Sequence, residues 1–178
     1  FCNGTNDNFF WPPAWMKSTS ITKGPVNRYY KPRMPHGHAP SGDPKEITAF
    51  ADAVLKGAQP LPSFTVFSHD DRRVQAQVAS PTDIASAEII YTATSTGEWK
   101  SRQWLSIPIA ITKDNAAGVE GVNGTDGTDG TKGTDGTAVV VGSIRLDVTA
   151  PADAIAAYLA VTDSRGLFVS SPVIFWLE

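Results

Sequence analysis

The first part of the chain alternates between strand-like and helix-like stretches of hydrophobic positions. Short apolar runs at residues 1–3 and 27–34 predict two strands. Between them, a predicted helix begins at Pro12 and ends before Gly24. Strands and helices in alternation are typical of an α/β fold, so this part of the chain is predicted to be α/β.

Residues 43–56 carry the strongest helix pattern. Asp43 is a predicted N-cap, Pro44 takes the first helical position, Glu46 completes a capping box, and Gly57 follows the last turn. Apolar residues recur at helical spacing and form one face: Ile47, Phe50, Ala51, Val54 and Leu55. Such a face needs a sheet to cover it, and two predicted strands are too few. We therefore expect a piece of a larger α/β domain whose other part lies upstream.

The periodicity changes after residues 58–62, which we interpret as a linker. Seven short stretches rich in β-branched and aromatic residues predict strands: 64–69, 72–79, 87–94, 102–111, 139–149, 155–162 and 167–176. This pattern is typical of an immunoglobulin-like β-sandwich over residues 63–178. Within it, residues 119–137 form a low-complexity stretch with glycine at every third position. We interpret that stretch as a loop, with weak calcium binding as the alternative.

Charge and composition support two modules and exclude two classes of partner. Residues 1–60 hold seven Lys/Arg and four Asp/Glu, a net charge of +3, whereas residues 61–178 hold eight and fourteen, a net charge of −6. No basic stripe follows any predicted element, so we expect no nucleic-acid partner. No apolar run approaches the length of a membrane span, so we expect no membrane partner.

The residues that could do chemistry cluster just after the two predicted strands. Asp7 follows the first, and His36 and His38 follow the second, separated by Gly37. An aspartate followed by a histidine on loops at the ends of neighbouring strands has the order that closes an α/β-hydrolase triad. The alternatives are an Asx turn at Asp7 and a metal-ligand pair formed by the two histidines.

Three motifs in the first 62 residues resemble a known family. They are Gly-Thr-Asn-Asp-Asn-Phe-Phe at residues 4–10, Arg-Met-Pro-His-Gly-His at 33–38, and the helix from Glu46 to Gly57 followed by Pro-Leu-Pro at 60–62. In this order and spacing they resemble the C-terminal end of acetylxylan-esterase-like and dienelactone-hydrolase-like α/β-hydrolases. The resemblance implies that Asp7 is the triad acid and His38 the base, with His36 as the alternative base. His36 is then expected to point away from Asp7.

The resemblance leads to a functional expectation. Residues 1–57 would be the C-terminal fragment of a serine ester hydrolase that supplies acid and base, with a small ester or acylated carbohydrate as substrate. No Gly-x-Ser-x-Gly occurs in the chain, so the nucleophile is expected upstream. Trp11 and Trp15 are candidates for the substrate pocket, with core packing as the alternative.

Family habit favours a secreted or periplasmic protein, and no cofactor or metal is expected. A non-catalytic β-sandwich that serves as a binding or structural module is the competing interpretation. The identity of the substrate and the oligomeric state stay open.

Overall fold

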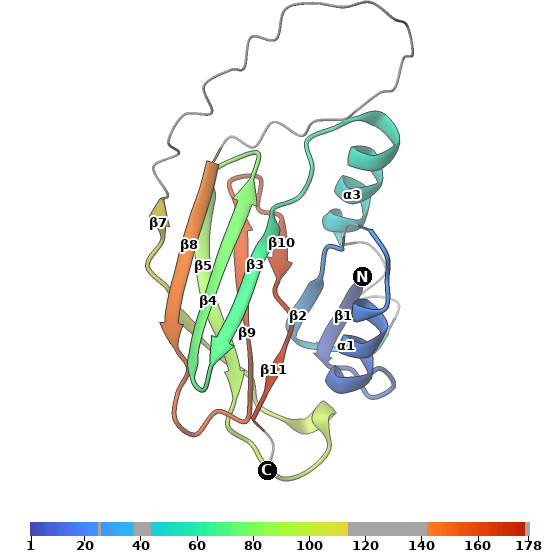
Figure 1. Cartoon of the computed structure of the whole chain (residues 1–178). Helices are drawn as coiled ribbons and strands as arrows, with labels where there is room; N and C mark the ends of the chain where they lie inside the picture. The colour runs from blue at the N-terminus through green and yellow to red at the C-terminus, as the bar shows by residue number, and fades with distance from the viewer. Residues whose placement is uncertain (25, 38–43, 114–141, 177–178) are drawn as a thin grey trace, which may run out of the picture.

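Strands dominate the fold (Figure 1). The computed structural model describes residues 1–24, 26–37, 44–113 and 142–176. Within these, 45% of residues are in strands and 17% in helices. The elements are β1 (Cys2–Asn6), α1 (Pro12–Ser20), β2 (Tyr29–Pro35), α3 (Lys45–Lys56), β3 (Ser63–Asp70), β4 (Arg73–Ser80), β5 (Ile84–Thr92), η1 (Trp99–Ser101), β6 (Leu105–Pro108), β7 (Thr112–Lys113), β8 (Gly142–Thr149), β9 (Ala156–Asp163), β10 (Phe168–Ser170) and β11 (Ile174–Phe175).

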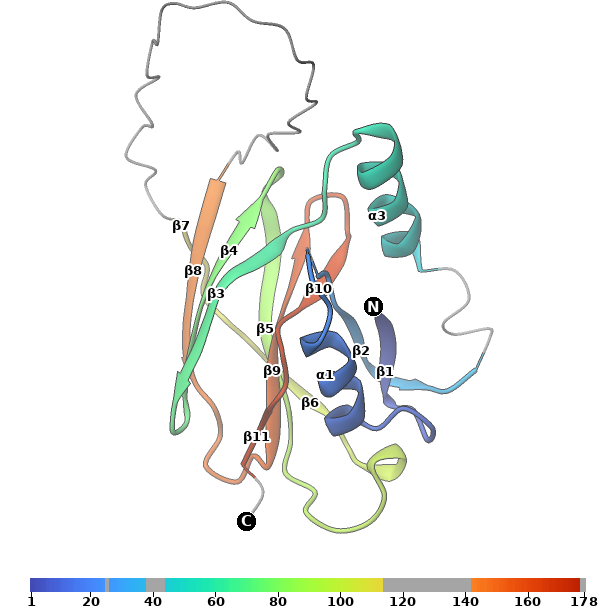
Figure 2. The same cartoon turned by 45° about the vertical axis from the view of Figure 1, so that its right-hand side comes forward.

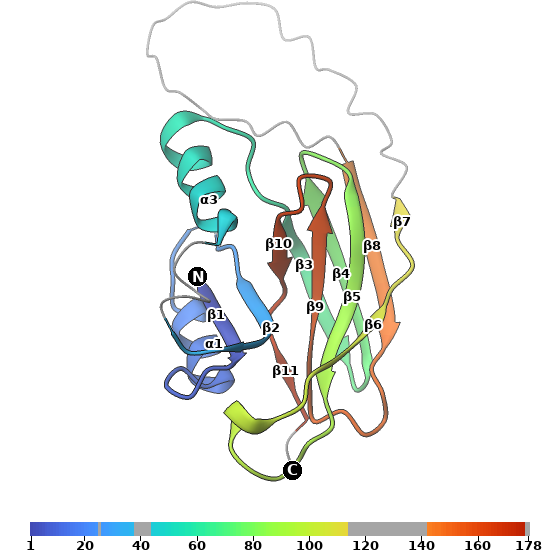
Figure 3. The same ribbon diagram turned by 180° about the vertical axis from the view of Figure 1, so that it is seen from behind.

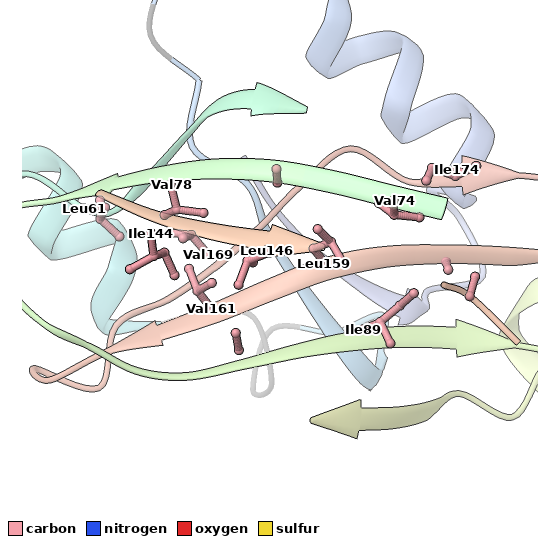
Figure 4. Close-up of a cluster of buried hydrophobic side chains, with 14 of the residues drawn as sticks. Leu61, Val74, Val78, Ile89, Ile144, Leu146, Leu159, Val161, Val169 and Ile174 are labelled. Atoms are coloured by element: carbon pink, nitrogen blue, oxygen red, sulfur yellow. The ribbon is translucent and has the colours of Figure 1, made fainter. Parts of the chain in front are cut away.

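Two antiparallel sheets pack face to face as a β-sandwich. One sheet has the order β3-β4-β8-β7, and the other has the order β10-β9-β5-β6 with β11 beside β9. In β4, residues on one face are buried and those on the other are more exposed, as alternation along a strand requires. Val74, Val78, Leu146, Leu159 and Ile89 meet between the sheets (Figure 4). Each such side chain stabilises the fold by about 1.5–3 kcal/mol.

A small parallel unit lies beside the sandwich (Figure 2). β1 and β2 pair in parallel, and α1 connects them. An aromatic cluster joins this unit to the sandwich: Trp15 of α1 stacks on Tyr30 of β2, with ring centroids 4.7 Å apart, and Tyr30 packs against Trp104 and Tyr158. The Tyr158 hydroxyl donates to the Tyr30 carbonyl at 2.8 Å. The small unit and the sandwich therefore share a buried core.

Helix α3 begins at Lys45, one residue later than its sequence pattern predicts. Within the described residues no side chain caps its N-terminus, and Asp43 lies outside them. The Glu46 carboxylate accepts the backbone N–H of Phe168 in β10 at 2.8 Å instead of completing a capping box. Gly57 ends the helix in the left-handed conformation, with φ of 67°.

The expected α/β-hydrolase fold is wrong for this structure. The described residues contain only two α-helices and three sheets, and the one parallel sheet has two strands. The predicted fold needs a broad sheet to cover the apolar face of residues 43–56. Instead, α1 is covered by the aromatic core shared with the sandwich. The α3 face is covered poorly, since Val54 and Leu55 are 65% and 80% exposed.

One of the predicted sandwich strands is divided into two, and another is shorter than predicted. Residues 102–111 contain β6, which pairs with β5, and are followed by β7, which pairs with β8 in the other sheet. Residues 167–176 contain β10 and β11, which pair with different parts of β9. Pro108 and Pro172 supply no backbone donor at these breaks, which explains why single long strands do not form. The predicted loop at 119–137 lies outside the described residues.

Candidate acid–base site

Asp7 and His36 meet at the carboxyl ends of β1 and β2. Parallel pairing brings both strand ends to one edge of the small sheet, so loops that follow the two strands become neighbours. The Oδ2 atom of Asp7 lies 2.9 Å from Nδ1 of His36. This carboxylate–imidazole pair is the central feature of the site.

Asp7 is held in place by its own turn. Its Oδ1 accepts the backbone N–H groups of Phe9 at 2.7 Å and Phe10 at 2.9 Å. Burial has the largest single effect on the pKa of this carboxyl and raises it, but the hydrogen bonds from Phe10, Phe9 and His36 together lower the pKa below its ordinary value of 3.8. Asp7 therefore makes an Asx-type turn and also engages the histidine.

An irregularity in β2 directs the chain toward His36. The register shifts between Gly4, which is opposite Lys31, and Asn6, which is opposite Pro35. Within the shift, Arg33 has a φ of 60°, in the left-handed region that side chains rarely adopt. The Arg33 backbone N–H donates to the Thr5 hydroxyl at 2.8 Å. Such irregular strands recur next to functional sites, where they redirect a side chain.

The two strands approach closely at Gly4. A Cβ at this position would lie 1.9 Å from the Met34 carbonyl oxygen, so only glycine fits. Glycine at this position lets the paired strands bring the Asp7 and His36 loops together.

The His36 ring is held by Asp7 and two aromatic rings but stays partly exposed. Its ring packs against Phe9, with centroids 4.7 Å apart, and Phe10, at 5.9 Å. The side chain is 41% exposed, whereas that of Asp7 is 6% exposed. A carboxylate at Nδ1 favours the proton on that nitrogen and leaves Nε2 as the acceptor. The arrangement can therefore accept a proton at Nε2 from a group that reaches the ring.

The structure corrects one expectation about the histidines. His36 does not point away from Asp7 but contacts it, and His38 lies outside the described residues. No group of three His, Cys, Asp or Glu side chains that could hold a metal ion occurs in the described ranges.

The two candidate pocket tryptophans have different positions. Trp11 is 55% exposed and, with Asn8, Glu98 and Lys100, lines a small hollow of about 70 Å³. Trp15 is 6% exposed and stacks on Tyr30 in the shared core, so its assignment to the pocket is wrong. Core packing, the alternative considered for both residues, therefore applies to Trp15.

Sequence reasoning missed the part that the sandwich plays in this site. The η1 helix lies near the carboxyl end of β1 and beside α1 (Figure 3). The Asn6 side-chain amide donates to the carbonyls of Lys100 at 2.7 Å and Arg102 at 3.0 Å. No local signal could have indicated this contact, because the residues are more than ninety positions apart.

Comparisons of the chain with protein-family models, with curated proteins and with solved structures found no match. Among the described helices, none is long and apolar enough to cross a membrane.

Proposed function

We propose that Asp7 and His36 are the acid and base of a serine ester hydrolase. The contact of 2.9 Å between Asp7 Oδ2 and His36 Nδ1 carries this proposal. In such a site the carboxylate fixes the imidazole tautomer and stabilises the imidazolium that forms when Nε2 takes the proton of the serine hydroxyl. The fixed carboxylate and the partly exposed imidazole support these roles.

His36 replaces His38 as the proposed base because of its contact with Asp7. A general base must lie within hydrogen-bond reach of the group that orients it. The observed contact of His36 therefore outweighs the sequence resemblance that favoured His38.

The proposed nucleophile comes from a segment outside residues 1–178. No Gly-x-Ser-x-Gly occurs within these residues. We therefore expect the 178-residue chain alone to hydrolyse no ester by this mechanism.

The proposed substrate is a small ester or an acylated carbohydrate. Trp11 offers an exposed aromatic face, and Asn8, Glu98 and Lys100 place amide and charged groups around the same hollow. An apolar face surrounded by hydrogen-bonding groups suits a sugar ring that carries an acyl group.

The test uses the full-length natural protein that contains these residues, with p-nitrophenyl acetate and acetylated xylan as substrates. We expect His36→Ala to lower kcat by about 10⁴-fold or more, because members of a triad act as a unit. The matched variant His38→Ala should lower kcat by less than about tenfold, since it leaves the pair intact. A fluorophosphonate probe should label one serine outside residues 1–178.

Two results would reject the proposal. One is full activity in His36→Ala, with loss of activity in His38→Ala. The other is the absence of both esterase activity and fluorophosphonate labelling in the full-length protein, which would favour the non-catalytic β-sandwich module.

A further inference from the structure

A second hollow lies at the opposite end of the small sheet from Asp7 and His36. It has a volume of about 250 Å³. The first residues of β1 and β2, the first turns of α3 and part of β10 form its wall, including Cys2, Tyr29, Glu46, Ile47, Phe50 and Phe168. We call this space the α3 hollow. The proposed hydrolase chemistry does not use it.

The wall of the α3 hollow is mainly aromatic and aliphatic. The rings of Tyr29 and Phe168 meet edge to face, with centroids 5.6 Å apart. Ile47 and Phe50 are 48% and 40% exposed, although they belong to the apolar face of α3. An apolar or aromatic ligand body of about ten non-hydrogen atoms would cover these side chains and gain free energy in proportion to the area buried.

One carboxylate stands in this apolar wall. Glu46 is 7% exposed, and its Oε1 accepts the Phe168 N–H. Within the described residues, Glu46 forms no ion pair with lysine or arginine. Burying a carboxylate without a cationic partner costs free energy. A cation that binds in the hollow would lower this cost.

No described cation near the α3 hollow forms an ion pair with Glu46. The terminal ammonium of Phe1 donates to the Asn27 carbonyl at 3.0 Å. Arg28 borders the hollow, but its Nε donates to the hydroxyl of Thr19 on α1, at 3.1 Å. The Lys31 ammonium lies 5.1 Å from the Phe168 ring centroid and 6.0 Å from that of Tyr29. Lys31 thus shows that these rings accept an ammonium group, yet it forms no ion pair with Glu46.

We propose that the α3 hollow binds a small organic cation. The ammonium group would lie near Glu46, and the apolar or aromatic body would contact Tyr29, Phe50 and Phe168. A carboxylate and aromatic faces together are the groups that recognise ammonium ligands. Burial, followed by the charge of Glu46, raises the pKa of Tyr29 to about 12.

The test compares three ligands with the same body and different charge. Phenethylammonium, 2-phenylethanol and phenylacetate are titrated into the 178-residue chain by calorimetry. We expect phenethylammonium to bind about tenfold more tightly than the alcohol, because the ammonium adds Coulomb attraction to the carboxylate. Phenylacetate should bind most weakly, because its negative charge is repelled by that of Glu46.

Two variants separate charge from apolar contact. Glu46→Gln keeps an oxygen that can accept the Phe168 N–H, so the fold should persist while the preference for phenethylammonium over 2-phenylethanol disappears. Lys31→Met removes a competing ammonium from the same rings and should strengthen the binding of phenethylammonium. Near-UV circular dichroism checks that both variants keep the native packing.

Cys2 is the single cysteine of the chain and lines the α3 hollow, so its reactivity shows whether a ligand binds there. Bound phenethylammonium should slow the alkylation of Cys2 by iodoacetamide at least threefold. Equal affinity for the three ligands, no binding at millimolar concentration, an unchanged preference in Glu46→Gln, or an unchanged alkylation rate at saturation would each overturn the proposal. None of these outcomes bears on the Asp7–His36 pair, so the two proposals fail separately.

Discussion

At the scale of single residues, the Asp7 carboxylate links the candidate site to stability. Its pKa lies below the ordinary value in the folded protein, so the folded state binds the proton less readily than the unfolded state. The resulting stabilisation is complete above pH 4 or so and is lost as the pH falls through the lowered pKa.

This sign gives a pH-dependent prediction for Asp7→Asn. At pH 6 the variant should be less stable than the natural chain by about 1–3 kcal/mol, because the charge-assisted hydrogen bonds are lost. The difference should shrink between pH 4 and pH 2. Urea unfolding at several pH values measures it, and a difference that is independent of pH would show that the charge of Asp7 does not contribute.

A second prediction at this scale concerns the close approach of the two strands at Gly4. Gly4→Ala places a methyl group against the Met34 carbonyl, so the strands must separate at a cost of about 1–3 kcal/mol. Gly142→Ala is the control, because nothing lies within 4 Å of a Cβ there, and it should change stability by less than about 0.5 kcal/mol. Urea unfolding of both variants provides the comparison, and equal effects would contradict the close approach.

The single-residue evidence also shows what the sequence could predict of the site. The sequence predicts Asp7 and the neighbourhood of His36, because each follows a strand and parallel strands end at the same edge. The choice between His36 and His38 was not available from sequence, because a Pro-His-Gly-His run does not record the irregularity at Arg33 that directs the loop. Contacts from η1 to Asn6 depend on the tertiary fold alone.

At the scale of elements, local patterns located the helices well but misjudged what they pack against. The apolar spacing in α3 indicated a helix, and the helix is present. It did not reveal that the side of the helix near Val54 and Leu55 stays exposed among the described residues. Periodicity reports which positions share a face, whereas the partner of that face depends on distant segments.

The stretch after α3 shows the same limit. Residues 58–62 have the composition of a linker, yet Leu61 is 5% exposed and belongs to the core of the sandwich. Arg165 donates from its guanidinium to the carbonyls of Gln59 at 3.1 Å and Pro60 at 2.7 Å. These contacts fix the stretch to the sandwich.

A matched pair of leucines tests this point. Leu61→Ala should lower the free energy of unfolding by about 2–5 kcal/mol, because it leaves a cavity in the core. Leu55→Ala, six positions earlier, should change it by less than about 0.5 kcal/mol, because Leu55 is 80% exposed. Urea unfolding followed by fluorescence gives both values. Similar losses for the two variants would mean that the end of α3 is covered in solution.

At the scale of the whole molecule, the division into two modules has to be weighed against the shared aromatic core. Opposite net charges and different periodicities favoured separate units. However, Trp15 and Tyr30 from the small unit are buried against Trp104, Tyr158 and Phe168 of the sandwich. Separating the two parts would expose these rings to water, at a cost that scales with their large apolar area.

The shared core predicts that the two parts unfold together. In hydrogen exchange followed by mass spectrometry, the slowest amides of β1 and β2 should report the same opening free energy as those of β4 and β8, because neither set can open without exposing the cluster. Trp15→Ala should lower that free energy by about 3–5 kcal/mol in both sets at once. Trp11→Ala is the control, since Trp11 is 55% exposed, and it should leave both sets unchanged. If Trp15→Ala accelerates exchange in β1 and β2 while β4 and β8 keep their protection, the sandwich is an independent folding unit and the cluster only docks the small unit onto it.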